Sequence, residues 1–290
     1  MPRPVCRHGE EAICYPDDDQ RNVFGHLASL EGHGERHSHS KAQLLCALKG
    51  VITVEAATGI WTVPPGGAIW IPGGYPHSAR TAGSAEVGCL YLAPELALQI
   101  GTQCGILFFQ PLLREVVLRF LEGSAPSMND ARLIHLANVL LDELQAAPKE
   151  PFRLPMPMDR RVRRIAESLL DEPSQRLTVE EWGKRTGASK RTLSRAFLRE
   201  TGMTFVKWRQ QLHVGLALQR LAAGEQVTNI AIDLGYENVS AFISMFKRRT
   251  GTTPARYFQN TANGATRVRD ETAKDLPSRL NASPGVSVLS

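Results

Sequence analysis

Apolar and polar positions divide this chain into a strand-rich part followed by a helical part. From Val23 to about Leu92, short apolar stretches are separated by turn signals such as Glu31-Gly-His-Gly and Pro64-Pro-Gly-Gly. This spacing predicts a small antiparallel barrel or sandwich. Beyond Pro94 the apolar residues recur every three or four positions, which predicts two amphipathic helices after the strands.

A proline-rich segment marks a domain boundary. Residues 146–157 contain four prolines, a composition that breaks helices and favours extended backbone. We therefore expect a two-domain α+β chain: a sheet-rich domain with its helical pair at 1–145, a linker at 146–157 and an all-α domain at 158–260. Residues 261–290 lack periodicity and are rich in small and polar residues, which predicts a disordered tail.

An internal repeat with a period of about 49 residues lies in the all-α domain. Its matching positions are Phe197 with Phe246, Thr201 with Thr250, and Gly202 with Gly251. A short helix ending at glycine is expected before each copy, at 179–187 and at 227–235. A short helix, a glycine that accepts positive φ and a second helix of about three turns form a helix-turn-helix unit. The repeat therefore predicts two such units.

Capping residues delimit the second helix of each unit. Ser189 is placed as the N-cap in the first unit, and Asn238 or Ser240 in the second. Both second helices are expected to end at a Thr-Gly pair. Between the units, an apolar stripe predicts a buried connecting helix that holds them in a fixed relation. The stripe consists of Phe205, Trp208, Leu212 and Leu216.

The second helix of each unit is expected to pack its apolar face on the first helix and to insert its outer face into a DNA major groove. Arg191 and Arg195 are candidates for base edges, because arginine bridges guanine O6 and N7. Lys190 and Arg199 are candidates for phosphates. The second unit has few side chains that can form two hydrogen bonds with one base, so we expect it mainly to bind the DNA backbone. The other candidate contacts are Ser194, Val239, Ser240, Ala241, Ser244, Lys247 and Arg248.

Charge supports this division of roles. Residues 1–157 carry a net charge of −4 and residues 158–260 a net charge of +8, which favours a polyanion as partner of the second domain. No apolar run approaches the roughly 20 residues that span a bilayer, and the first residues lack the apolar core of a signal peptide. We therefore expect a cytoplasmic protein without a membrane partner, and its five cysteines, all before residue 105, as reduced thiols.

Several stretches of the all-α domain resemble the DNA-binding domain of the AraC/XylS family of regulators. They are Gly187-Ala-Ser-Lys-Arg-Thr-Leu-Ser-Arg-Ala-Phe, Ile230-Ala-Ile-Asp-Leu-Gly-Tyr and Gly251-Thr-Thr-Pro-Ala-Arg-Tyr. The resemblance covers about residues 158–258. It implies that two units joined by a long helix reach successive major grooves on one side of double-stranded DNA.

A set of histidines lies in the strand-rich part. His37 and His39 alternate on one strand face, and Gln43 and His77 are placed to join them. Three imidazoles and a carbonyl oxygen suit one divalent transition metal, namely Zn, Ni, Co or Fe(II). This part resembles the cupin barrel, in which a glutamate is usual where Gln43 stands.

A pocket for a small organic effector is the competing use of the barrel. Its candidate walls are Trp61, Trp70, Tyr75 and Tyr91, although each of these aromatics is also suited to filling the core.

Taken together, these patterns predict a non-enzymatic, one-component transcription regulator whose barrel responds to a small molecule or a metal. Expected further partners are RNA polymerase and a second copy of the chain. A metal-dependent cupin enzyme fused to a DNA-binding domain is the alternative from another class. A constitutive DNA-binding protein whose barrel only dimerises is a third, and it predicts no response to ligand.

Overall fold

The computed structural model describes residues 16–122, 131–147, 149–150 and 153–257. The tail expected at 261–290 and the thiols of Cys6 and Cys14 lie outside this part, whereas Cys46, Cys89 and Cys104 are free. The strands are β1 (Val23–Leu30), β2 (Ala42–Lys49), β3 (Ile52–Ala56), β4 (Gly59–Val63), β5 (Gly67–Ile71), β6 (His77–Thr81), β7 (Ala85–Leu92), β8 (Gly105–Phe108), β9 (Lys149–Glu150) and β10 (Arg153–Pro155). The helices are α1 (Pro94–Ala97), α2 (Pro111–Leu121), α3 (Ala131–Ala146), α4 (Arg160–Asp171), α5 (Val179–Thr186), α6 (Lys190–Thr201), α7 (Phe205–Ala222), α8 (Val227–Asp233) and α9 (Val239–Thr250).

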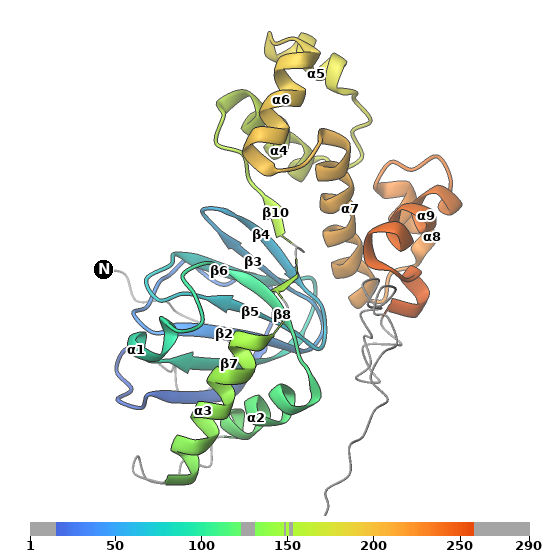
Figure 1. The fold of residues 1–290 in the computed structure, drawn as a ribbon. Coiled ribbons are helices and arrows are strands. Elements are labelled where there is room, and N and C mark those ends of the chain that lie inside the picture. Colours follow the sequence, from blue (N-terminus) through green and yellow to red (C-terminus); the bar gives the residue numbers. More distant parts are fainter. Residues whose placement is uncertain (1–15, 123–130, 148, 151–152, 258–290) are drawn as a thin grey trace, which may run out of the picture.

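The strands form two antiparallel sheets packed face to face (Figure 1). One has the order β1-β7-β2-β5-β8-β9 and the other the order β10-β4-β3-β6. The expectation of an antiparallel, sheet-rich domain is confirmed. The structure differs from the expected barrel in one minor respect: in the described chain, no ladder of named strands joins one sheet to the other. The predicted barrel is therefore an open sandwich.

Alternation along the strands separates two apolar cores. Leu45, Ile69 and Ile71 face the space between the sheets, whereas Leu44 and Trp70 face the opposite side of the six-stranded sheet. Helices α2 and α3 cover that opposite side (Figure 1). The layers are thus helices, large sheet and small sheet.

In the described part of the proline-rich segment, residues 149–150 and 153–155 are extended, as expected, and they are also part of the sheets. β9 pairs with β8, and β10 pairs with β4 with Pro155 opposite Gly59. A proline fits here because β10 is an edge strand, where the missing N–H breaks no ladder bond. The segment therefore anchors the helical domain to the small sheet.

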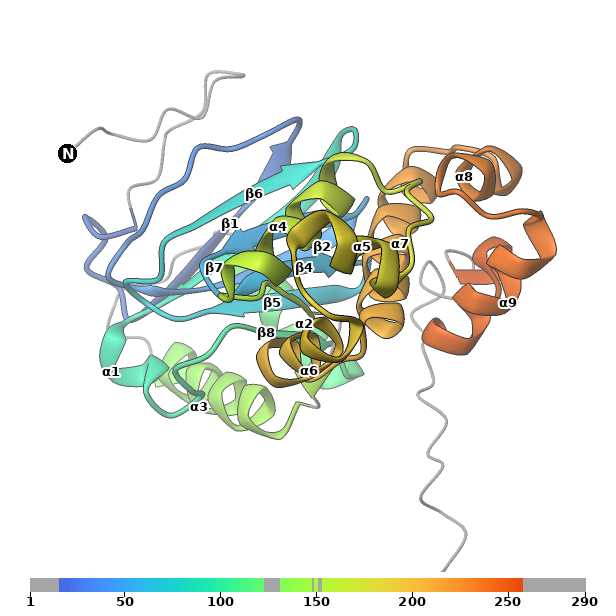
Figure 2. The same cartoon turned by 90° about the horizontal axis from the view of Figure 1, so that it is seen from above.

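The helical domain has the expected two units, α5–α6 and α8–α9, joined by the 18-residue helix α7 (Figure 2). Each unit packs around its own apolar core, and each core includes a residue of the sheet domain. Leu154 of β10 joins the core of α4–α6, and Val51 joins the core of α7–α9. The Trp208 indole also donates a hydrogen bond of 2.7 Å to the Pro155 carbonyl. The sheet domain thus contacts both units.

Among the residues that the structure describes, no helix combines the length and the apolar character needed to cross a bilayer.

Candidate nucleic-acid interface and candidate metal centre

The local sequence builds the first helix-turn-helix unit through its caps. Thr178 and Glu181 form a reciprocal capping box at the start of α5, which ends at Gly187 with φ of 67°. The Ser189 hydroxyl accepts a hydrogen bond of 3.1 Å from the Thr192 amide and so starts α6. Gly202, with φ of 70°, ends α6. The predicted N-cap and helix end are confirmed.

The second unit repeats this design. The Asn238 carbonyl oxygen accepts a hydrogen bond of 2.8 Å from the Ala241 amide, so Asn238 rather than Ser240 is the N-cap of α9. Gly251, with φ of 78°, ends the helix. Both second helices are therefore three-turn segments held at each end.

The basic side chains of α6 differ in whether a carboxylate lies beside them. Arg191 and Arg195 are exposed, and within the described residues neither forms an ion pair. Lys190, in contrast, lies 3.7 Å from the Glu180 carboxylate, and Arg199 lies 2.9 Å from that of Glu200. The two unpaired guanidinium groups are available to an external acceptor, which suits the base-edge role predicted for them.

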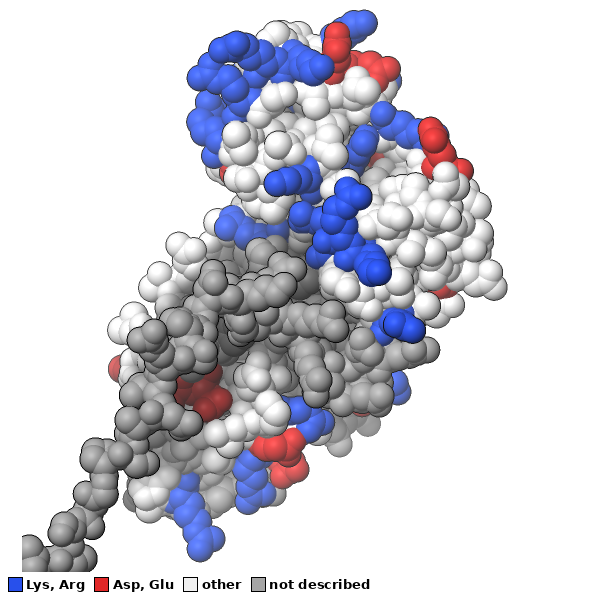
Figure 3. All heavy atoms as spheres, turned by 45° about the vertical axis from the view of Figure 1, so that its right-hand side comes forward, with Lys and Arg blue, Asp and Glu red and all other residues white. Residues whose placement is uncertain are grey.

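The remaining predicted contacts divide by exposure. Ser194 on α6 and Ser240, Ala241, Ser244, Lys247 and Arg248 on α9 are exposed. Val239 differs, because it is half-buried and packs against the core of the second unit. On the face shown in Figure 3, basic side chains gather over the helical domain, as the charge division predicted.

In addition to the connecting helix α7, a polar contact around His213 fixes the two units relative to each other. The buried His213 of α7 lies 3.1 Å from the Pro173 carbonyl through Nε2 and 3.0 Å from the Tyr236 hydroxyl through Nδ1. The carbonyl can only accept, so Nε2 donates to it and Nδ1 accepts from Tyr236. Burial lowers the pKa of His213 to about 4. His213 therefore ties the loop after α4 to the turn after α8.

Gly235 lies at the same contact. A Cβ atom added to it would lie 2.5 Å from the Ser174 carbonyl oxygen, and its φ is +80°. Only glycine permits this approach. We call the contact between residues 173–177 and 235–237 the inter-unit seam. Sequence reasoning identified Gly235 as a turn residue but missed the seam, because nothing local to the turn shows what packs on it.

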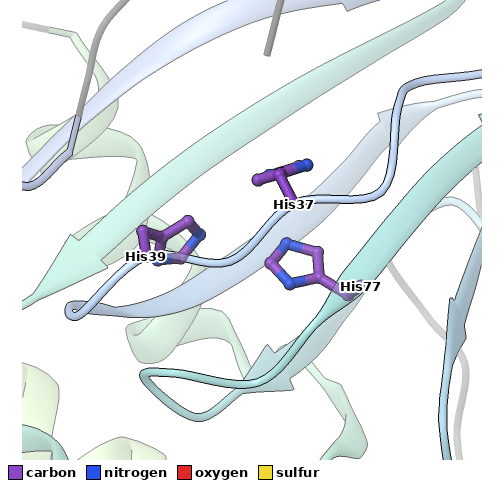
Figure 4. A group of neighbouring side chains, drawn as sticks. All are labelled: His37, His39 and His77. Atoms are coloured by element: carbon purple, nitrogen blue, oxygen red, sulfur yellow. The ribbon is translucent and has the colours of Figure 1, made fainter. Parts of the chain in front are cut away.

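The predicted histidines gather where the two sheets meet. The strand expected at His37 and His39 is not formed, because these residues lie in the segment before β2, where His37 makes an isolated bridge. This segment runs beside β6, with reciprocal main-chain hydrogen bonds of 2.9 Å between His37 and His77. The ligand atoms of His37, His39 and His77 lie within 4.8 Å of one another (Figure 4). A tetrahedral metal with bonds of about 2.1 Å holds its ligands roughly 3.4 Å apart, so small side-chain rotations suffice to bind one.

Each of the three imidazoles is oriented by a main-chain carbonyl. Nδ1 of His37 lies 2.9 Å from the Glu35 oxygen, Nδ1 of His39 lies 2.7 Å from that of Lys41, and Nδ1 of His77 lies 2.8 Å from that of Tyr75. Because a carbonyl only accepts, each Nδ1 carries the hydrogen, and each Nε2 of a neutral ring keeps its lone pair. This is the outer-shell arrangement of metal-binding histidines.

Gln43 contributes a side-chain carbonyl oxygen to the cluster, and burial affects the charge of two of the imidazoles. The Gln43 carbonyl oxygen lies 3.2 Å from Nε2 of His77 and 3.3 Å from Nε2 of His39. Burial lowers the pKa of His39 and lowers that of His77 to about 4. Both rings are therefore neutral at pH 7, which is the form that binds a metal.

The aromatic residues proposed as pocket walls lie in different places. Trp61 is buried in the core between the sheets, and Trp70 faces the helices on the other side of its sheet. The Tyr75 hydroxyl donates to Thr58 at 3.2 Å, whereas the Tyr91 ring lies 5.4 Å from that of His39. Tyr91 thus borders the histidine cluster through its ring, whereas Tyr75 contacts it through its main-chain carbonyl. The structure thus separates this predicted set.

Two parts of the chain match models of known protein families. Residues 22–172 match the family described as the AraC-like ligand binding domain, and residues 182–260 match a helix-turn-helix domain. The HTH-type transcriptional regulator NimR of Escherichia coli is 36% identical over 93% of this chain and 94% of its own length. RipA, an HTH-type transcriptional regulator of Corynebacterium glutamicum, is 31% identical over 45% of each chain.

Among solved structures, one to which this chain is similar is that of ToxT of Vibrio cholerae with a bound unsaturated fatty acid. Its sequence is 11% identical, the match covers 81% of this chain and 94% of that one, and the TM-score is 0.34.

Proposed function

Because this chain belongs to the AraC family of transcription regulators, with a DNA-binding helix-turn-helix domain and a ligand-binding sheet domain, we propose that its ligand is a divalent transition metal. The proposed ligands are His37, His39 and His77, with the carbonyl oxygen of Gln43 as the fourth. One observation carries the proposal: three main-chain carbonyls accept from the Nδ1 atoms of three imidazoles whose ligand atoms lie within 4.8 Å of one another.

The donor set narrows the choice of metal. Three imidazole nitrogens and one neutral oxygen suit Zn, Ni, Co or Fe(II) better than Mg or Ca, which prefer oxygen ligands. The bound ion supplies a positive centre to which donor atoms of a further molecule can bind. All four protein ligands are neutral, so the chain itself does not offset that charge.

The site is connected to the helical domain through one strand. His77 is the first residue of β6, and Arg80, three residues along, lines a small cavity against α7. Thr62 of β4 and Gly215 of α7 line the same cavity. We infer that drawing His77 toward a metal shifts β6 and alters the contact with α7. A metal that prefers one docked arrangement thereby changes the affinity for DNA.

We assign the site to sensing rather than to catalysis, because NimR, which matches this chain over 93% of its length, is a transcription regulator. A regulator of this kind works where its DNA is, so the proposal places the protein in the cytoplasm. RNA polymerase and a second copy of the chain stay predicted partners.

Metal analysis tests the proposal. Protein purified without a histidine tag is expected to hold about one metal ion per chain, and His37→Ala/His39→Ala/His77→Ala is expected to hold none. His33→Ala is the matched control, because His33 is exposed on the same segment and lies outside the cluster. Equal metal content in the triple variant would reject the metal centre and leave a small organic effector.

The domain contact has its own test. A Cβ atom on Gly215 would lie 2.8 Å from the Thr62 hydroxyl oxygen, so Gly215→Ala is expected to loosen the docking of α7 on β4. Alanine also favours the helix by about 1 kcal/mol over glycine, so α7 itself should not weaken. The ratio of DNA affinities with and without metal is expected to approach one.

Thr62→Ala removes the colliding oxygen, so the double variant Gly215→Ala/Thr62→Ala is expected to regain the metal response. Fluorescence anisotropy with labelled DNA measures both variants. A native response in Gly215→Ala would show that this contact does not transmit the signal.

A further inference from the structure

The Gln43 side chain lies between the imidazoles of the histidine cluster and the Tyr91 hydroxyl. Its carbonyl oxygen lies 3.2 and 3.3 Å from Nε2 of His77 and of His39, and its amide nitrogen donates to the Tyr91 hydroxyl at 3.4 Å. Gln43 and Tyr91 are directly opposite each other on β2 and β7, and both side chains are buried. Bulk solvent therefore has little access to the amide, and its hydrogen-bond partners lie within the protein.

This orientation suits a cation and does not suit an empty site. Nδ1 of His39 and of His77 donates to a main-chain carbonyl, so Nε2 of each neutral ring has only a lone pair. Together with the Gln43 carbonyl oxygen, three acceptors face one another. A positive ion between them makes the arrangement favourable, whereas without one the acceptors repel.

The opposite orientation of the amide suits the empty site. Rotating the terminal amide by half a turn exchanges groups of nearly equal size, so the packing is preserved. The NH₂ group then donates to the two imidazole nitrogens, and the carbonyl oxygen accepts from the Tyr91 hydroxyl. A tyrosine hydroxyl both donates and accepts, so Tyr91 satisfies the amide in either orientation.

We propose that the Gln43 amide is a two-position switch that closes the histidine cluster with its NH₂ group when no metal is bound and offers its carbonyl oxygen when a metal binds. Tyr91 is the positioning residue for both states. This inference rests on the proposed metal site and says how that site is regulated. A metal must break two hydrogen bonds to enter, so it binds more weakly and leaves more readily than from a site with glutamate.

Gln43→Glu tests the energetic consequence. A carboxylate has no NH₂ group to donate, and it adds a negative charge, so the empty state loses its satisfied form while the loaded state gains. We expect the zinc affinity, measured by competition with a chromophoric chelator, to rise about 100-fold. A thermal unfolding curve of the metal-free variant checks that it folds. An affinity equal to that of the native chain would overturn the proposal.

The rotation itself is measured by NMR on full-length protein with ¹⁵N-labelled glutamine. The Gln43 signal is assigned by its absence in Gln43→Glu. In metal-free protein its amide protons are expected to show NOEs to the rings of His39 and His77. After zinc is added, the NOEs are expected to move to the Tyr91 ring. The same partners in both states would overturn the switch.

The two proposals fail in different ways. If the native chain binds no zinc, the metal site is rejected, while the NOEs of the metal-free protein still decide whether the amide closes the cluster. If zinc binds and the NOEs do not move, the metal site stands and the switch is rejected.

Discussion

Replacing Arg191 and Arg195 together by alanine is expected to abolish sequence-specific DNA binding while the protein stays folded. Both side chains lie on the exposed face of α6 and, in the part of the chain that the structure describes, have no acidic partner. Each bidentate contact with a base contributes about 1–3 kcal/mol of discrimination. Losing both weakens specific binding by about 2–6 kcal/mol, on the order of 30-fold to 10⁴-fold.

The measurement is fluorescence anisotropy with a DNA site selected by the native chain and with a scrambled duplex of equal length. Arg114→Ala/Arg119→Ala is the control, because it removes the same charge from exposed positions on α2. A loss of equal size on both duplexes would assign Arg191 and Arg195 to phosphates. Unchanged affinity would exclude them from the interface.

Gly235→Ala is expected to destabilise the helical domain and to disturb its DNA binding. An αL backbone costs a residue with a Cβ atom about 1–2 kcal/mol, and here φ is +80°. The added methyl group would also lie 2.5 Å from the Ser174 carbonyl oxygen across the inter-unit seam. We expect the free energy of unfolding to fall by about 2–4 kcal/mol, within the range of severe single substitutions. The two units should lose their fixed spacing.

Gly202→Ala separates the two causes. Gly202 has φ of +70°, but nothing lies within 4 Å of where its Cβ would be. It should therefore show the backbone cost alone and keep native DNA affinity. Thermal unfolding and anisotropy on both variants make the comparison, and equal losses in the two would remove the seam from the explanation.

The helix-turn-helix units were predictable because their signals are local. Ser189 and Asn238 accept from amides three residues away, and the helices end at Gly202 and Gly251 within the same turn. A cap or a positive φ depends on its neighbours in the chain, and so sequence alone places it.

Features that depend on distant pairing were not predictable to the same extent. Alternation placed His37 and His39 together, but it did not show that Trp61 and Trp70 face different cores. A strand's assignment to one core or the other depends on which strand pairs with it and in which register. The same is true of Gly215, whose place opposite Thr62 depends on how two domains dock.

The role of Tyr91 shows the limit most clearly. As an aromatic on a predicted strand, it is a candidate pocket wall, but its residue type favours a place in the core. Its position beside Gln43 follows from the register of β2 and β7, in which the two residues are paired. Candidate ligands were therefore readable from residue type, whereas the groups that orient them were not.

Apolar residues of the sheet domain are part of the cores of both helix-turn-helix units. They limit which domains of this protein can be exchanged with those of its relatives. Leu154 and Val51 are buried in the cores of the first and second units. A chimaera that keeps the helical domain and exchanges the sensor therefore leaves two holes unless the new sensor brings side chains of similar shape at the same places. The ligand-binding domain and the DNA-binding domain of this chain therefore have to evolve as a matched pair. Their border lies inside two hydrophobic cores, one of which includes Leu154 of the proline-rich segment.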